Sequence, residues 1–138
     1  MVTKPIEFWF DFSSPYGYLA SYRIDAIGEE FGREVTWRPY LLGAVFKSSG
    51  QSPLVSQPMR GPYHVKDMQR TARKQRVPLV LPEGFPMATI AAARAFYWQE
   101  ATDPRRAVRL TGPDGVPNPE EGIAAGERMT VGSEGRRW

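Results

Sequence analysis

The stretch "IEFWFDFSSPYGYLA", residues 6–20, passes from one periodicity to another. Apolar residues first occupy every second position, which is typical of a strand with one richly buried face. From Tyr16 the apolar residues recur at three- and four-residue steps, which predicts an amphipathic helix that ends near Gly32. The strand face carries four apolar side chains: Ile6, Phe8, Phe10 and Phe12.

The junction between this strand and this helix allows two interpretations. Ser14 is a favourable N-cap and Pro15 a favourable first helical residue, so the pair predicts a helix start. A serine at such a helix start also lies where a ligand could approach the helix. Both roles are compatible, because a capping serine accepts a hydrogen bond and still has a proton to donate.

A second strand is predicted in "REVTWRP", residues 33–39, so residues 1–40 have the proportions of a βαβ unit. Residues 41–102 are expected to form a helical insertion, with a short helix at "LLGAVFK" and longer helices over 62–76 and 87–101. The fold class predicted is therefore α/β.

Composition excludes several kinds of chemistry. The chain has 138 residues, no cysteine and one histidine, which excludes disulfides, thiolate metal sites, cysteine nucleophiles and a histidine-rich metal cluster. Its net charge of +3 is only mildly basic, so we expect no nucleic-acid partner. Without a signal peptide or a long apolar run, the expectation is a cytoplasmic chain with no membrane association.

The last part of the chain, residues 103–138, differs in composition. It is rich in glycine and proline, and Trp138 is its only aromatic residue. A segment with so little apolar material does not offset its ordering entropy, so we expect a mostly disordered tail. A short helix near Glu120–Arg128 is the only element expected there.

Three segments together resemble a known family: "IEFWFDFSSPYGYLA", "WRPYLLGAVFKSSGQSP" and "YHVKDMQRTARKQRVPLVLP". They are similar to 2-hydroxychromene-2-carboxylate isomerase and kappa-class glutathione transferase, in the DsbA-like branch of the thioredoxin superfamily. The resemblance covers roughly residues 5–102. It implies that the βαβ unit is part of a thioredoxin-like fold with an inserted helical domain.

The resemblance also implies a cofactor, glutathione. Ser14 would lie near the glutathione sulfur as the catalytic residue, with Pro15 and Tyr16 in the same turn. Gln51 and Arg60 would contact other parts of glutathione. The implied reaction is a cis–trans isomerisation in aromatic-compound catabolism, in which the thiolate adds, a bond rotates and the thiolate leaves.

Several alternatives stay open. The substrate is expected to be a small aromatic-derived carboxylate, and the residue that would bind its carboxylate is Lys47, Arg60 or Lys66. A kappa-type transferase and a non-catalytic thioredoxin-like fragment are the alternative functions, and a homodimer is possible. Disulfide oxidoreduction is excluded by the absence of cysteine.

The family pattern does not continue past residue 102, and no counterpart of its cis-proline half is visible. We therefore expect a chain truncated or read out of frame at its C-terminus, or one whose missing half comes from a partner chain. The aromatic strand face would then be poorly covered, with marginal stability and weak or absent glutathione binding.

Two side chains are expected to have no catalytic role. Asp11 is interpreted as a polar residue at a strand end, and His64 as a surface residue of the helix predicted over 62–76. The basic residues of that helix are expected to form a solvated face.

Overall fold

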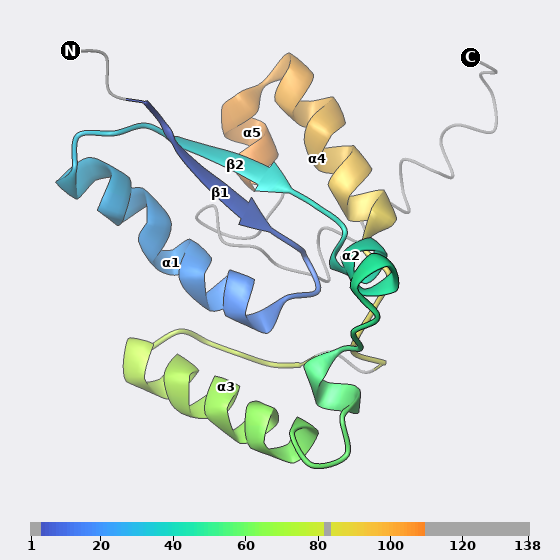
Figure 1. Cartoon of the computed structure of the whole chain (residues 1–138). Helices are drawn as coiled ribbons and strands as arrows, with labels where there is room; N and C mark the ends of the chain where they lie inside the picture. The colour runs from blue at the N-terminus through green and yellow to red at the C-terminus, as the bar shows by residue number, and fades with distance from the viewer. Residues whose placement is uncertain (1–3, 82–83, 110–138) are drawn as a thin grey trace, which may run out of the picture.

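The computed structural model describes residues 4–81 and 84–109 of the chain. Two parallel strands pair with Phe8 opposite Trp37 and lie against the first helix (Figure 1). The predicted order of strand, helix and strand is confirmed. In chain order the elements are β1 (Ile6–Phe10), α1 (Pro15–Glu30), β2 (Val35–Pro39), α2 (Leu42–Ser49), the 3-10 helix η1 (Leu54–Ser56), α3 (Gly61–Gln75), α4 (Ile90–Thr102) and α5 (Pro104–Arg109).

The main core lies on one face of the two strands. The Phe10 ring stacks on the Phe8 ring and contacts Trp37 and Phe96 edge to face. The ring centroids are 5.5 Å apart for Trp37 and 6.0 Å apart for Phe96. Such aromatic pairs stabilise a core beyond the area they bury. The buried members of this cluster come from the strands, from the turn after β1 and from α4 and α5: Phe10, Phe12, Trp37, Ala92, Phe96 and Ala107.

The expectation of a poorly covered aromatic face is wrong for its two innermost residues. Phe10 is 1% exposed and Phe12 is 2% exposed. The reason is that α4 packs on β2, where the Tyr97 hydroxyl donates to the Pro39 carbonyl at 2.8 Å, and this contact places Phe96 over the aromatic face. Trp9, on the opposite face of β1, is more than half exposed.

The described structure also differs from the expectation of a disordered tail from residue 103, because residues 104–109 form α5. Asp103 accepts a hydrogen bond from the Arg106 amide at 3.1 Å, and Pro104 occupies the start of the helix. A proline at this position loses no intrahelical hydrogen bond. Ala107 is fully buried against the aromatic core. The remainder of the expected tail, with the helix expected near Glu120–Arg128, lies outside the described residues.

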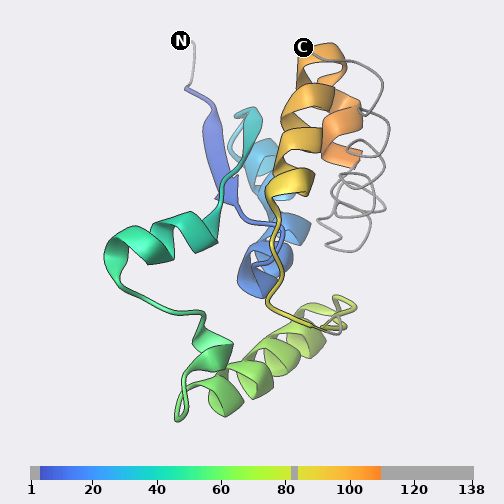
Figure 2. The ribbon, with the colours of Figure 1, turned by 90° about the vertical axis from the view of Figure 1, so that its right-hand side faces the viewer.

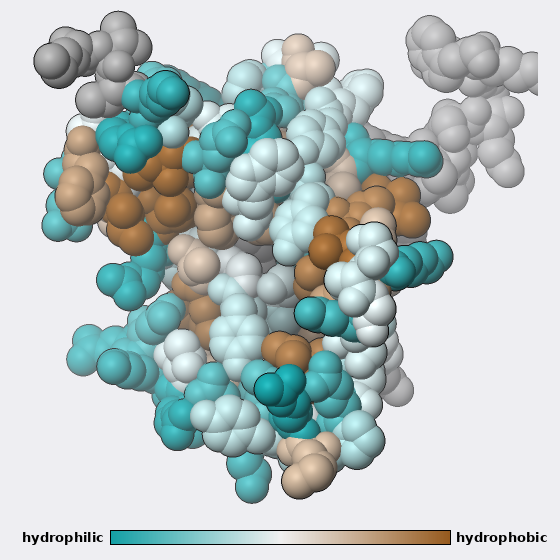
Figure 3. Space-filling model, in the orientation of Figure 1, coloured by the Kyte–Doolittle hydropathy of each residue, from teal (hydrophilic) through white to brown (hydrophobic). Residues whose placement is uncertain are grey.

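A second, smaller core joins α1 to α3. Leu19 packs with Ala72 and Val77, and the Tyr18 hydroxyl donates to the Pro78 carbonyl at 2.6 Å. In Figure 2, α3 lies apart from the strands, while α4 and α5 lie beside them. Hydrophilic side chains gather over α3 in Figure 3, and its basic residues are exposed, which confirms the predicted solvated face.

We expect alanine at Gly28 and at Gly43 to have opposite effects, although both glycines are helical. A Cβ at Gly28 would lie 2.6 Å from Val35 Cγ2 and 2.8 Å from the Arg33 carbonyl oxygen, whereas a Cβ at Gly43 would meet nothing within 4 Å. Gly28→Ala should cost about 1–3 kcal/mol through overpacking. Gly43→Ala should stabilise by about 0.5–1 kcal/mol, because alanine favours a helix. Urea denaturation of the two variants checks this, and equal midpoints would contradict the packing of α1 on β2.

Candidate functional site

The turn between β1 and α1 is built around Ser14. Its backbone is extended, with φ −92° and ψ 107°, and its Oγ accepts a hydrogen bond from the Gly17 amide at 3.1 Å. Pro15 follows as the first helical residue. The predicted cap is therefore confirmed. Among the described residues, the Ser14 hydroxyl proton has no acceptor, so it is available to a ligand.

The carboxylate of Asp11 holds this turn in place through hydrogen bonds. Asp11 is the polar residue at a strand end that the sequence suggested, directly after β1, and it is only 2% exposed. Its Oδ1 accepts from the amide and hydroxyl of Ser13, both at 2.6 Å, and from Thr89 Oγ1 at 3.0 Å. Its Oδ2 accepts from the Leu42 amide at 2.6 Å. These hydrogen bonds offset the cost of burying a carboxylate.

These bonds connect three segments that are far apart in the sequence. Leu42 begins α2, whose N-cap Leu41 offers no side-chain acceptor, so Asp11 caps α2 from another element. Thr89 is the residue just before α4. A carboxylate near a helix N-terminus is also favoured by the helix dipole. Asp11 therefore positions α2 and α4 relative to the Ser14 turn.

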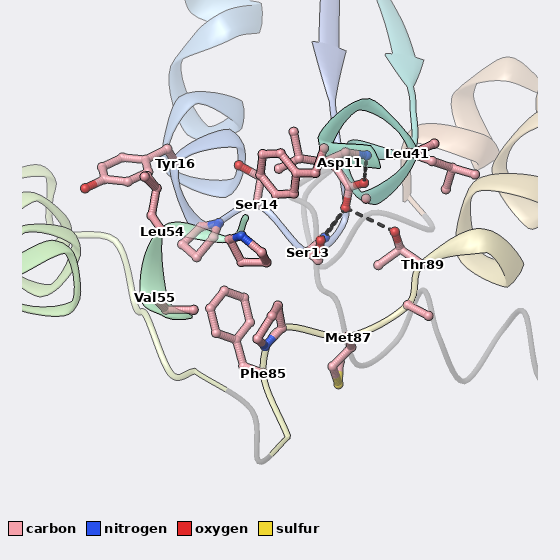
Figure 4. Close-up of a pocket in the computed structure, with 18 of the residues that line it drawn as sticks. Asp11, Ser13, Ser14, Tyr16, Leu41, Leu54, Val55, Phe85, Met87 and Thr89 are labelled. Carbon is pink, nitrogen blue, oxygen red and sulfur yellow. Dashed lines mark hydrogen bonds between the residues drawn. The ribbon is translucent and has the colours of Figure 1, made fainter. Parts of the chain in front are cut away.

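A cavity of about 500 Å³ opens beside this turn. In Figure 4, Val55 and Phe85 lie on the side of the cavity opposite Ser14. Most of its lining is apolar, which suits an organic ligand with a few oriented polar contacts. The larger apolar residues come from α2, from the segment around η1, from α3 and from the segment before α4: Leu41, Leu42, Phe46, Pro53, Leu54, Val55, Met68, Phe85, Pro86, Met87 and Ile90.

The structure brings together some of the sequence-predicted site residues and leaves others apart. Four line the cavity: Ser14, Pro15, Tyr16 and Lys47. Gln51, Arg60 and Lys66 are exposed and are not among the residues that line it. Gln51 follows the left-handed Gly50 that ends α2, Arg60 precedes α3, and Lys66 lies within α3.

Tyr16 is held by α3. Its hydroxyl donates to Asp67 Oδ2 at 2.9 Å and lies 3.2 Å from His64 Nδ1. Burial, assisted by the hydrogen bond to Asp67, raises the pKa of Tyr16 to about 12. Arg70 donates to the other oxygen of Asp67 at 2.6 Å, and this bond and the one from Tyr16 lower the pKa of that carboxyl. Tyr16 is therefore a neutral phenol bound to a carboxylate.

His64 differs from the expectation of a surface residue, because it is half-buried and lines the cavity. Its spacing from Asp67 was the available signal. Residues three apart share a helix face, so a side chain from another element that binds Asp67 can also approach His64. What the sequence does not show is that this face of α3 meets Tyr16.

Within residues 4–81 and 84–109, none of the helices has the length and apolar character of a membrane span. No group of three or more histidine, aspartate or glutamate side chains lies close enough to hold a metal ion there.

Comparison with known proteins places this architecture. A family model described as a DSBA-like thioredoxin domain matches residues 5–111. One similar solved structure is that of selenomethionine-labelled 2-hydroxychromene-2-carboxylate isomerase. The match covers 90% of this chain and 64% of that chain, with a TM-score of 0.62 and 23% sequence identity. That likeness shows the shared fold.

Curated relatives carry two names. Glutathione S-transferase kappa 1 of Caenorhabditis elegans is 36% identical over 81 residues, which cover 58% of this chain and 36% of the relative. A 2-hydroxychromene-2-carboxylate isomerase of Sphingobium xenophagum is 30% identical over 86 residues, which cover 61% of this chain and 44% of the relative. The match thus spans less than half the length of each.

Replacing the Asp11 carboxylate with an amide should destabilise the fold. In Asp11→Asn, an NH₂ group takes the place of one oxygen and faces a donor that it cannot satisfy. We expect a loss of about 2–4 kcal/mol in the free energy of unfolding, measured by denaturant titration. Glu30→Gln, at an exposed carboxylate of α1, is the matched control and should change it by less than about 0.5 kcal/mol. Equal effects of the two variants would contradict the role given to Asp11.

Tyr16 should ionise only at strongly alkaline pH. Because folding raises its pKa from 10.0 to about 12, the contribution of the neutral hydroxyl to stability is complete below pH 10.0 and is lost as the pH rises through about 12. The difference in tyrosinate absorbance between wild type and Tyr16→Phe should therefore rise near pH 12. In concentrated guanidinium chloride, which unfolds the protein, the same absorbance difference should rise near pH 10.0, the ordinary pKa of tyrosine. A rise at the ordinary value in the folded protein would contradict the contact with Asp67.

Proposed function

Because the chain belongs to the DsbA-like thioredoxin domain family, we propose that it binds glutathione with the thiol at the N-terminus of α1. The observation that carries this proposal is the Ser14 turn. Ser14 Oγ accepts a hydrogen bond from the Gly17 amide, and its own proton has no acceptor among the described residues. The hydroxyl can therefore donate to a sulfur while it caps the helix.

The donors at this helix start fit a thiolate. Pro15 has no N–H, and the Tyr16 amide has no acceptor in the part of the chain that the structure describes. Together with the Ser14 hydroxyl, this amide forms a small donor set at the positive end of a 16-residue helix. Such helix ends favour anions.

When bound, glutathione would supply a thiol, which reacts as the thiolate. The chain would contribute the environment that favours this ionised form. Ser14 would donate a hydrogen bond to the sulfur, the start of α1 would add partial positive charge, and the apolar cavity walls would exclude water and strengthen both effects.

The remaining contacts in this proposal follow the family resemblance. Lys47, on the cavity wall, is the candidate for a substrate carboxylate, and Lys66 is an alternative. Gln51 and Arg60 are the candidates for other parts of glutathione, and both are exposed. These residues hold only part of the tripeptide, so we expect a dissociation constant above the micromolar range.

The activity we propose is a glutathione-dependent isomerisation of the 2-hydroxychromene-2-carboxylate type, on an aromatic-derived carboxylate. The support is a mostly apolar cavity beside Ser14, with the cationic Lys47 on its wall. A kappa-type transferase uses the same thiol site and is the second candidate, supported by the similarity to glutathione S-transferase kappa 1.

Two substitutions of Ser14 separate capping from sulfur binding. Ser14→Asp keeps an N-cap but places a negative charge against the thiolate, whereas Ser14→Ala removes both the cap and the donor. We expect both variants to lose glutathione binding at least tenfold by isothermal titration calorimetry. Only Ser14→Ala should also lose about 1 kcal/mol of stability. Ser48→Ala, an exposed serine of α2, is the control. Wild-type affinity in Ser14→Asp would exclude Ser14 as the sulfur partner.

The same variants test activity. Turnover of 2-hydroxychromene-2-carboxylate by wild type should fall to background in Ser14→Ala and persist in Ser48→Ala. Equal, background-level turnover in all three proteins would instead favour the non-catalytic thioredoxin-like fragment.

A further inference from the structure

The cavity has four titratable side chains among its described lining residues: Asp11, Tyr16, Lys47 and His64. Three of them are poor proton acceptors. Both oxygens of Asp11 are engaged by protein donors, Tyr16 holds its proton against Asp67, and Lys47 is a cation with donors only. His64 is the remaining group that can take up a proton from a ligand.

The hydrogen bonds around Tyr16 fix which ring nitrogen of His64 carries the proton. Asp67 accepts from Arg70 on one oxygen and from Tyr16 on the other, so it is an ionised carboxylate. The Tyr16 hydroxyl has a single proton, which it donates to Asp67. The 3.2 Å contact between Tyr16 Oη and His64 Nδ1 therefore requires the proton to lie on Nδ1.

With Nδ1 as the donor, the lone pair of the neutral ring lies on Nε2. No protein donor to Nε2 is present in residues 4–81 and 84–109, and the ring lines the cavity. Its orientation is held from two sides by edge-to-face contacts, with Tyr63 at 5.7 Å and Tyr16 at 6.3 Å between ring centroids.

We propose that His64 is the proton acceptor of this cavity, with Nδ1–H held by Tyr16 and Nε2 taking the proton of a thiol bound at Ser14. This inference rests on the proposed function. The S–H bond breaks and an N–H bond forms on Nε2. The electron pair stays on sulfur, so a thiolate and an imidazolium replace a thiol and an imidazole. Ser14 and His64 line the same cavity, where the thiol and Nε2 would meet.

The charges around the ring are mixed. Asp67 lies behind Tyr16 on α3 and is paired with Arg70. Lys47 and Asp11 face the same cavity from α2 and from the end of β1. The thiolate itself, held at the start of α1, would be the anion that faces the imidazolium.

The tautomer can be read directly, because His64 is the only histidine of the chain. In the free protein, nitrogen-15 NMR of the neutral ring should show the proton on Nδ1 and the lone pair on Nε2. Tyr16→Phe should shift the proton toward Nε2, whereas Tyr22→Phe, at an exposed tyrosine of α1, should leave it on Nδ1. A proton on Nε2 in the wild-type protein would overturn the proposal.

Glutathione and S-methylglutathione then separate this proposal from the proposed function. Both should shift the amide signals of the Ser14 turn, but only glutathione, which has a thiol proton, should convert His64 to the imidazolium at neutral pH. Amide shifts without protonation of His64 overturn the proton transfer and leave glutathione binding standing. No amide shift with either probe overturns glutathione binding, and the proton transfer with it.

Discussion

The carboxylate of Asp11 is the constraint on which the arrangement of the site depends. One buried side chain ends β1, shapes the turn before α1, caps α2 and binds Thr89 at the start of α4. A buried carboxylate can connect several segments only when all of its hydrogen bonds are made, because each missing hydrogen bond leaves a buried charge or an unpaired donor. The geometry around Ser14 therefore follows from a residue with no chemical role of its own.

The second constraint is Tyr16, which joins the turn to α3. The hydrophobic contact of Leu19 with Ala72 brings the two helices together, and the bond from Tyr16 to Asp67 sets how they face each other. The same bond determines the donor and acceptor pattern of His64. Packing between α1 and α3 thus has a chemical consequence inside the cavity.

Local periodicity was sufficient to predict the βαβ unit, the Ser14 cap and most helices, because these depend on neighbouring residues. The contact of α4 with the two strands was not predictable in this way. It depends on Tyr97 reaching Pro39 and on Phe96 reaching Phe10, which lie far apart in the sequence. Helix α5 was missed because composition was averaged over the segment, although "DP" at 103–104 is a local helix-start signal.

For the site, the sequence identified Ser14 and Tyr16 but assigned both Asp11 and His64 to minor roles. Each of these two gains its role from partners on other elements, Asp11 from α2 and the start of α4, and His64 from α1. A single sequence shows residue types and spacings along one element. It does not show which faces of different elements meet, and buried polar side chains depend on that.

The proposed function depends on a thiol binding at the N-terminus of α1. A crystal structure of the chain soaked with glutathione at saturating concentration tests it most directly. The expected result is a sulfur within hydrogen-bond distance of Ser14 Oγ, inside the cavity that His64 also lines. A sulfur bound elsewhere, or an empty turn at saturating glutathione, would contradict it.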